Sequence, residues 1–253
     1  HTRYILAHID GYADDVLLAK QFAKAGGVYG SDHMTEGFSG YLCEILTIYY
    51  GGFHALLCAA ACWRPGEVVD IEGHGRKPFD EPLVVIDPVD PERNVAAALS
   101  LSRMFEFAEL ARGYLAEPSE VFFCRSPSPP LTRDVFSRLL AARGTHLFSV
   151  TFATPDYTPD TVVPQLRKSA DSIRELLERS GFAANRIDVC MGKERCVLLF
   201  ELMASDVPAM RRHIGPPLSS RENAEKFLAK YVQEDVFAGP YVEDGRYVVE
   251  VPR

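Results

Sequence analysis

The stretch Arg125-Ser-Pro-Ser-Pro-Pro130 divides this sequence of 253 residues into two parts with different patterns of apolar residues. Each proline fixes its own φ angle and removes a backbone donor, so the stretch can extend neither a helix nor a strand from either side. Before it, apolar residues recur mostly at helical spacing; after it, alternating strand patterns appear. We therefore predict two domains, at residues 1–125 and 126–253.

The first part is predicted to be mostly helical. Between Asp14 and Ala25 the apolar side chains share one side of a helix, which Gly26-Gly27 would end. A second helix is expected to begin near Ser39, whose hydroxyl can cap free backbone amides. The other elements predicted here are helices at 53–63 and 94–115, the second capped by Asp90 or Asn94, and a buried strand at 83–86.

Six elements are predicted for the second part, in the order β-α-β-β-α-β. They lie at residues 146–153, 164–180, 187–191, 196–203, 222–231 and 246–251. This order is that of a ferredoxin-like split βαβ sheet. The fold class predicted for the chain is therefore α+β, with a helical domain followed by a ferredoxin-like domain.

The charge balance argues against a protein that coats nucleic acid through bulk charge. The net charge is −8, from 27 Lys and Arg against 35 Asp and Glu. Residues 1–159 carry 13 basic and 20 acidic residues, whereas residues 160–253 carry 14 and 15, so a local basic face is compatible with the second part. No run approaches the roughly 20 apolar residues of a membrane span, and no secretory signal is recognised. Because the first residue is His1 and not Met, we expect the chain to begin at a cut.

The six cysteines are expected to be buried or half-buried free thiols in a reducing compartment, which predicts a cytoplasmic location. They lie at positions 43, 58, 62, 124, 190 and 196. Cys58 and Cys62 are one helical turn apart, and no C-x-x-C pair completes a tetrahedral site. A structural zinc is therefore not predicted.

Motifs for the common catalytic chemistries are missing from the sequence. We find no P-loop, no G-x-G-x-x-G, no G-x-S-x-G and no H-E-x-x-H. A two-metal site needs carboxylates that point to one face, yet Asp14 and Asp15 are adjacent and would diverge. Asp87 and Asp90 lie in a proline-bounded loop and are interpreted as loop and capping residues. No catalytic residue and no metal ligand is predicted in this chain.

The most informative stretch is Asp87-Pro-Val-Asp-Pro-Glu-Arg-Asn-Val-Ala-Ala97, where a strand ends and a rigid turn follows. It would place Arg93 at a helix N-terminus, which the helix dipole disfavours, so another role should account for this arginine. Its fork of donors is suited to acceptor atoms on a base or a phosphate. Taken singly, Arg93 could equally be a surface arginine, Lys20 a solvated lysine and Tyr29 a packing residue.

The ordered set of short motifs resembles the archaeal (class I) CCA-adding enzymes, which are tRNA nucleotidyltransferases. In the first part the set comprises His1, Lys20, Ala25-Gly-Gly-Val-Tyr-Gly30, Gly37-Phe-Ser-Gly-Tyr-Leu-Cys-Glu44, Tyr50-Gly-Gly-Phe53 and the stretch from Asp87 to Ala97. In the second part it comprises Arg143-Gly-Thr145, Pro164-Gln-Leu166, Arg211-Arg-His-Ile-Gly-Pro-Pro217 and Arg221-Glu-Asn223 with Phe227. A basic residue usually precedes G-F-S-G in the family, and here it is Glu36, so no phosphate contact is expected from that position.

The resemblance implies an enzyme that adds C, C and A to the tRNA 3′ end from CTP and ATP without a nucleic-acid template. In the family a head domain carries the carboxylates that bind Mg²⁺; it would precede His1, and a helical tail would follow Arg253. Residues 1–125 would form the central domain, which resembles the substrate-binding domain of poly(A) polymerases. There His1, Lys20 and Tyr29 would contact the incoming ATP or CTP, and Arg93 would donate to its base. Residues from 126 would hold the acceptor stem of tRNA, and the chain alone is expected to be inactive.

Two other readings of the second part stay open. A stand-alone RNA-binding module without nucleotide selectivity would use the basic residues around the Gly215-Pro-Pro217 loop, a stiff segment before a helix. The candidates for contact with tRNA phosphates are Arg211, Arg212, Arg221 and Lys226. Alternatively, the ferredoxin-like half serves as a scaffold or as the interface of a homodimer.

Overall fold

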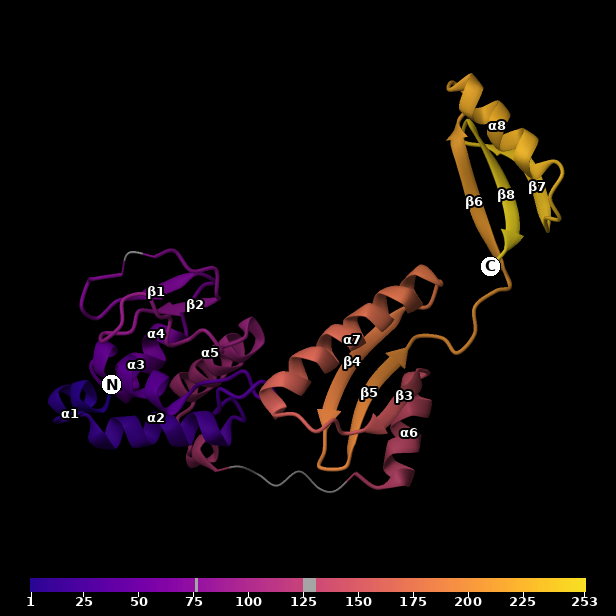
Figure 1. Ribbon diagram of the computed structural model, residues 1–253. Helices are drawn as coiled ribbons and strands as arrows, with labels where there is room; N and C mark the ends of the chain where they lie inside the picture. The colour runs from indigo at the N-terminus through magenta and orange to yellow at the C-terminus, as the bar shows by residue number, and fades with distance from the viewer. Residues whose placement is uncertain (76, 125–130) are drawn as a thin grey trace. The chain divides into compact units, whose positions relative to one another are not determined.

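The computed structural model describes residues 1–75, 77–124 and 131–253, and these form two compact units (Figure 1). Unit 1 comprises His1–Pro130 with Thr158–Pro164, and unit 2 comprises Leu131–Tyr157 with Gln165–Arg253. The boundary predicted between residues 125 and 126 lies outside the described residues. Each unit is described by itself.

Unit 1 is a helical bundle with a small parallel sheet. Its helices are α1 (Thr2–His8), α2 (Ala13–Ala25), α3 (Gly40–Tyr50), α4 (Phe53–Ala60), α5 (Leu101–Ala116) and the 3₁₀ helix η1 (Glu120–Phe123). Strands β1 (Glu67–Val69) and β2 (Leu83–Val85) pair in parallel. The predicted helices from Asp14 and Ser39 and the predicted strand are confirmed. Ser39 caps α3 by accepting a hydrogen bond from the Leu42 amide at 3.0 Å.

The core of unit 1 is built around Phe22 of α2. Its ring is fully buried and contacts five aromatic rings, those of Phe53, Phe107, Tyr114, Phe122 and Phe123. Helices α3 and α4 meet at 95° because Gly51 and Gly52 take positive φ angles of 80° and 121° between them. No single helix in the described part of the chain is long and apolar enough to cross a membrane, although the bent α3–α4 pair passes that test together.

The start of the last long helix differs from the prediction. Helix α5 begins at Leu101, not at residue 94, and its cap is Ser100, whose hydroxyl accepts from the Arg103 amide at 3.3 Å. Asn94 cannot serve as the cap, because its buried side chain bonds the Val85 amide at 2.8 Å. It thereby fastens the loop after β2 to the strand itself.

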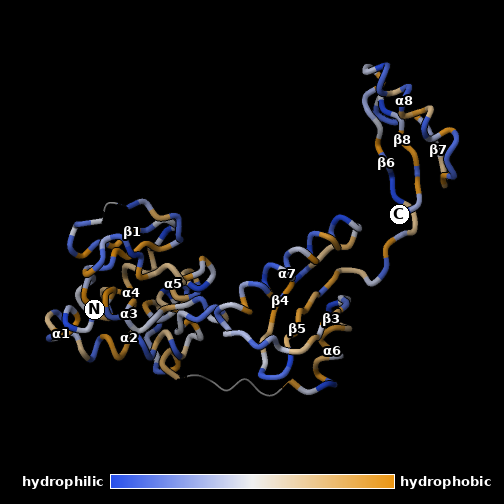
Figure 2. Tube along the Cα trace, in the orientation of Figure 1, coloured by the Kyte–Doolittle hydropathy of each residue, from blue (hydrophilic) through white to orange (hydrophobic). Residues whose placement is uncertain are grey.

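Unit 2 contains two three-stranded antiparallel sheets. The first has the order β3-β5-β4, from β3 (His146–Ala153), β4 (Ala184–Met191) and β5 (Arg195–Leu202). The second has the order β6-β8-β7, from β6 (Met210–Pro217), β7 (Ala238–Glu243) and β8 (Arg246–Pro252), with helix α8 (Arg221–Tyr231). Helix α6 (Arg133–Arg143) also belongs to unit 2, as does helix α7 (Pro159–Arg179) from Gln165 onward. The central strand β5 is apolar along most of its length (Figure 2).

The α+β class, with a helical first part and a sheet-rich second part, is confirmed. Within the second part the strands are divided over two sheets, where the predicted ferredoxin-like arrangement has one. Each sheet is a β-α-β-β unit in which the third strand lies between the other two. Strands β6 and β7 were not predicted because both contain proline, which usually argues against a strand. Here the prolines fall where the register shifts, between Ile214 and Pro217 in β6 and between Ala238 and Tyr241 in β7.

Candidate functional site

A buried carboxylate brings together two of the four predicted nucleotide-binding residues. Asp87 is fully buried, and its Oδ2 atom lies 2.9 Å from His1 Nε2 and 3.5 Å from Arg93 Nη1. Its Oδ1 atom accepts from the Tyr41 hydroxyl and from the Val89 amide, each at 3.0 Å. His1 and Arg93 are themselves 3.3 Å apart. Residues from three separate segments therefore meet at one carboxyl group.

The loop after β2 places Asp87 and Arg93 side by side. The Asp87 amide donates to the Arg93 carbonyl at 3.0 Å, and the Arg93 amide donates to the Asp90 carbonyl at 3.0 Å. Pro88 and Pro91 stiffen the turn between them. The prediction that Arg93 lies at a helix N-terminus is therefore wrong, because α5 begins eight residues later, at Leu101. The closed loop, and not a helix dipole, determines its position.

The contacts of His1 define which of its nitrogens carries a proton. Nε2 cannot donate to Asp87 and at the same time accept from Arg93. Since a buried carboxylate without a donor is costly, we assign the Nε2 proton to the His1–Asp87 hydrogen bond. Arg93 then acts as an ionic partner of the same carboxylate. A ligand of His1 would have to use Nδ1.

Tyr41 completes this cluster and was not among the predicted site residues. Its ring meets the His1 ring edge-on, with centroids 5.2 Å apart. Burial, followed by the charge of Asp87 and its hydrogen bond, raises the pKa of the Tyr41 hydroxyl. Tyr41 therefore stays a donor to Asp87 at every physiological pH. The Gly37–Glu44 motif contains this tyrosine. Its role is revealed only by its contact with Asp87, which lies 46 residues further along the chain.

Lys20 and Tyr29 meet at the first turn of α3. Lys20 Nζ lies 2.6 Å from Glu44 Oε1, and 21% of the Lys20 side chain is exposed. A Cβ atom added at Gly40 would lie 3.1 Å from the Tyr29 hydroxyl and 3.8 Å from Lys20 Nζ. Because the amides of a helix N-terminus attract anions, the Lys20 ammonium group, the Tyr29 hydroxyl and the first-turn amides of α3 other than that of Leu42, which Ser39 caps, make an anion-binding arrangement.

Gly40 and Tyr41 are consecutive residues, so the two clusters share the first turn of α3. The structure thus links the Lys20–Tyr29 pair to the His1–Arg93 pair through Gly40 and Tyr41 within unit 1. A cavity of about 460 Å³ adjoins Arg93, and its other polar lining residues include Ser31, Ser39 and the carboxylates of Glu81, Asp90 and Glu92. The arrangement offers an anion-binding end at Lys20 and a fork of donors at Arg93.

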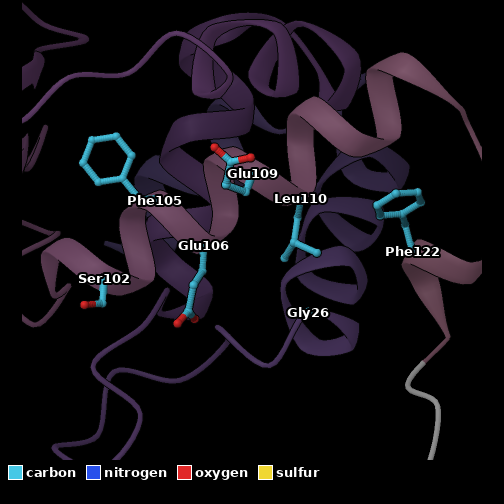
Figure 3. A pocket seen from close by; sticks show the side chains of 7 residues that line it. All are labelled: Gly26, Ser102, Phe105, Glu106, Glu109, Leu110 and Phe122. Atoms are coloured by element: carbon cyan, nitrogen blue, oxygen red, sulfur yellow. The ribbon is translucent and has the colours of Figure 1, made fainter. Parts of the chain in front are cut away.

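A different cavity of unit 1, of about 600 Å³, has none of these features (Figure 3). Its wall consists of Gly26, Ser102, Phe105, Glu106, Glu109, Leu110 and Phe122. The two carboxylates are already paired with arginines one turn away on α5, Arg103 and Arg112. Its only formal charges are negative, so it is unsuited to a polyanionic ligand.

The four basic residues predicted to contact tRNA are exposed but do not share one face. His213 stacks on Phe227 of α8, with ring centroids 5.5 Å apart, so Arg211, two residues away on β6, points to the α8 side. Arg212 points to the opposite side and forms an ion pair with Glu243 of β7. Arg221 is the first residue of α8, and Lys226 pairs with Glu222 at 2.6 Å.

The described residues hold no group of three or more His, Cys, Asp or Glu side chains that could bind a metal ion. The site residues therefore do not fit Mg²⁺, and no step of a metal-assisted reaction is assigned to them. All six cysteines are free, but the expectation that they are buried or half-buried holds only for Cys43 and Cys196, since the other four are exposed.

Two family models match the chain. Residues 14–124 match the tRNA nucleotidyltransferase second domain, and residues 143–253 match the CCA-adding enzyme C-terminal domain. The chain belongs to the family of CCA-adding enzymes. The first match covers unit 1 from α2 to η1, with Lys20, Tyr29 and Arg93 but without His1 and α1, and the second covers both sheets of unit 2.

Similar proteins come from archaea. The chain is 60% identical over 253 residues to a CCA-adding enzyme of Methanoregula boonei, covering all of this chain and 55% of that enzyme. It is 43% identical over 254 residues to one from Methanosarcina acetivorans and 44% identical over 255 residues to one from Halobacterium salinarum, covering 56% of each. The chain thus spans about half the length of the curated relatives it matches.

Proposed function

We propose that this chain supplies nucleotide recognition and tRNA binding in an enzyme that adds C, C and A to the tRNA 3′ end. The observation that supports this proposal is that two clusters adjoin the first turn of α3: Lys20 and Tyr29 lie beside Gly40, and Tyr41 contacts the Asp87 carboxylate that holds His1 and Arg93. Family membership supports the same activity. The Mg²⁺ ions and their carboxylates would belong to a head domain of the full-length protein, so the chain alone is expected to be inactive.

The two ends of the site suit the two ends of a nucleoside triphosphate. Lys20, the Tyr29 hydroxyl and the amides of α3 would hold the phosphates, because a cation and a helix N-terminus both favour negative charge. Arg93 would donate hydrogen bonds to the base. Cytosine N3 and adenine N1 are acceptors, whereas uracil N3 and guanine N1 carry hydrogens. A fixed guanidinium can therefore bind cytosine and adenine and discriminate against uracil and guanine.

Unit 2 would bind the acceptor stem of tRNA. A second candidate function, a stand-alone RNA-binding module without nucleotide selectivity, is favoured by the exposure of Arg211, Arg221 and Lys226. Nucleotide preference separates the two candidates, since only the first requires the site in unit 1. A homodimer, with the copies joined through unit 2, is compatible with both.

The test combines this chain with its tRNA substrate. Binding of labelled tRNA that lacks its 3′ CCA is measured as a salt titration, with a hairpin RNA as competitor. We expect binding that is selective for tRNA and weakens as salt rises, because phosphate contacts release counterions. With CTP, ATP and Mg²⁺ the chain alone should add no nucleotide, and adding a head domain in trans should restore addition. Equal binding of the hairpin would contradict the tRNA-binding role, and robust addition by the chain alone would contradict the inactivity.

A further inference from the structure

Asp87 joins the two nucleotide-facing side chains that lie outside the first turn of α3. Its carboxyl group is fully buried, whereas the side chains of His1 and Arg93 are 46% and 52% exposed. We propose that Asp87 is the positioning residue that sets nucleotide selectivity, by holding Arg93 and His1 in one fixed arrangement. This inference rests on the proposed function of Arg93 as the group that reads the base.

Selectivity by Arg93 requires that its guanidinium be fixed. A half-exposed arginine samples many rotamers, and a mobile fork of donors would find acceptors on any of the four bases. Cytosine and adenine can be separated from uracil and guanine only where the donors cannot move to another acceptor. In the described part of the chain, Asp87 is the acidic residue paired with Arg93, at 3.5 Å.

The two oxygens of Asp87 have separate partners. Oδ1 accepts from the Val89 amide and the Tyr41 hydroxyl, which fix the carboxyl group to the loop and to α3. Oδ2 faces His1 and Arg93, the two side chains expected to meet the nucleotide. The Asp87 carbonyl is held as well, because His74 Nε2 lies 3.1 Å from it. A rigid carboxyl group thus presents one oxygen to the site.

Because the two oxygens of Asp87 have different partners, a variant that alters Oδ2 alone tests the proposal. Asp87→Asn has the same shape and retains Oδ1 for Val89 and Tyr41, but its amide group replaces Oδ2. That amide cannot accept from His1, and its hydrogens repel the guanidinium of Arg93. The matched control is Asp90→Asn in the same loop. The Asp90 carboxylate accepts from the Glu92 amide at 3.1 Å, and no ion pair joins it to the Arg93 side chain among the described residues.

The experiment uses the full-length protein and tRNA lacking its 3′ nucleotides, with CTP, ATP, UTP and GTP supplied one at a time. For Asp87→Asn we expect the preference for CTP over UTP, measured as the ratio of kcat/KM values, to fall at least about tenfold. The KM for CTP should rise more than kcat falls, because substrate orientation is lost. A change that merely weakened folding would lower the use of all four nucleotides alike. For Asp90→Asn the preference should change less than about twofold.

Arg93→Ala distinguishes failure of this inference from failure of the proposed function. If Arg93→Ala abolishes the preference while Asp87→Asn retains it, the positioning role is overturned and the role of Arg93 stands. If Arg93→Ala retains the preference, the base-reading role itself fails. In the Arg93→Ala background, Asp87→Asn should cause no further loss of preference, and an added loss would contradict action through Arg93. Should Asp87→Asn not fold, Tyr41→Phe, which removes one bond to Oδ1, should cause a smaller loss of the same preference; an unchanged preference would overturn the inference.

Discussion

Gly40 is the residue at which the two halves of the candidate site come closest. A methyl group there would lie 3.1 Å from the Tyr29 hydroxyl, which is tighter than an ordinary contact, so the tyrosine would have to move by a few tenths of an ångström. Alanine is not disfavoured in a helix relative to glycine, so stability should not fall. We therefore predict that Gly40→Ala leaves the melting temperature of the chain unchanged or higher.

The same substitution should weaken nucleotide use. In the full-length protein, Gly40→Ala is expected to raise the KM for both CTP and ATP by about threefold to tenfold, since the displaced hydroxyl no longer meets the phosphates. Steady-state addition to tRNA lacking its CCA measures this. An unchanged KM together with an unchanged melting temperature would show that Tyr29 does not contact the phosphates.

Lys20 should act on the phosphates and not on the base. Its contact with Glu44 at 2.6 Å keeps the ammonium group at the first turn of α3. Lys20→Ala is therefore expected to raise the KM for CTP and ATP by the same factor, about tenfold, without changing the preference over UTP. Lys193→Ala, in the exposed turn between β4 and β5, is the control. Unequal effects on CTP and ATP would contradict a phosphate role.

The cysteines differ in their exposure, and this predicts their reactivity. Burial raises the pKa of the Cys43 thiol to about 12, so it holds little of the thiolate that reacts. Cys196 is buried too, whereas the other four cysteines are exposed. A thiol reagent applied to the folded chain should modify Cys58, Cys62, Cys124 and Cys190 quickly, and the other two only after denaturant is added. Rapid modification of Cys43, seen by mass spectrometry, would contradict its burial.

At the scale of single elements, the sequence predicted what local patterns determine. The start of α3 at Ser39 follows from a hydroxyl beside an apolar repeat, and the structure confirms it. The predicted start of α5 was wrong because Asn94, a good cap by residue type, instead accepts a hydrogen bond from the backbone of β2. Strands β6 and β7 were not predicted because their prolines interrupt the alternation of apolar and polar residues that is typical of a strand. These errors arise where a tertiary contact or a register shift overrides local preference.

The contacts of Glu201 fasten the end of α6 to the first sheet of unit 2. Its carboxylate accepts from Arg143 at 2.7 and 3.0 Å, and from Thr145 and Asn185. These hydrogen bonds, chiefly those from Arg143, lower the pKa of Glu201 from 4.5 to about 2. A carboxyl group whose pKa is lowered by folding stabilises the folded state above its unfolded pKa, and this contribution is lost as pH falls.

Glu201→Gln should therefore reduce stability in a pH-dependent way. At pH 7 the urea midpoint of the variant is expected to lie below that of the wild-type chain. The difference should shrink as pH falls from about 4.5 towards 2, because the wild-type carboxylate is protonated over that range. Glu194→Gln, in the exposed turn between β4 and β5, should change the urea midpoint little at pH 7 or at low pH. A difference that stays constant with pH would show that Glu201 acts through its shape and not its charge.

At the scale of the whole molecule, the candidate site depends on contacts that no local pattern contains. Lys20, Tyr29 and Arg93 were predicted through the family resemblance, because each lies in a short motif. Asp87 was interpreted as a loop residue, since its contact with His1 spans 86 residues of the chain. The site therefore became visible only once the helical unit was assembled around the first turn of α3.

The placement of the basic residues in unit 2 leads to the last prediction. Arg211 has no ion pair among the described residues, whereas Arg212 on the opposite side of β6 is paired with Glu243. A free arginine that meets a phosphate releases about one counterion, so Arg211→Ala should reduce the slope of log K against log salt for tRNA binding by about 1. Arg212→Ala should reduce it less, because Glu243 already neutralises that charge. Glu243→Gln, which frees Arg212, should increase the slope. These slopes come from fluorescence titrations of the chain with tRNA lacking its CCA. Equal reductions for the two arginines would show that tRNA displaces Glu243 and contacts both sides of the strand.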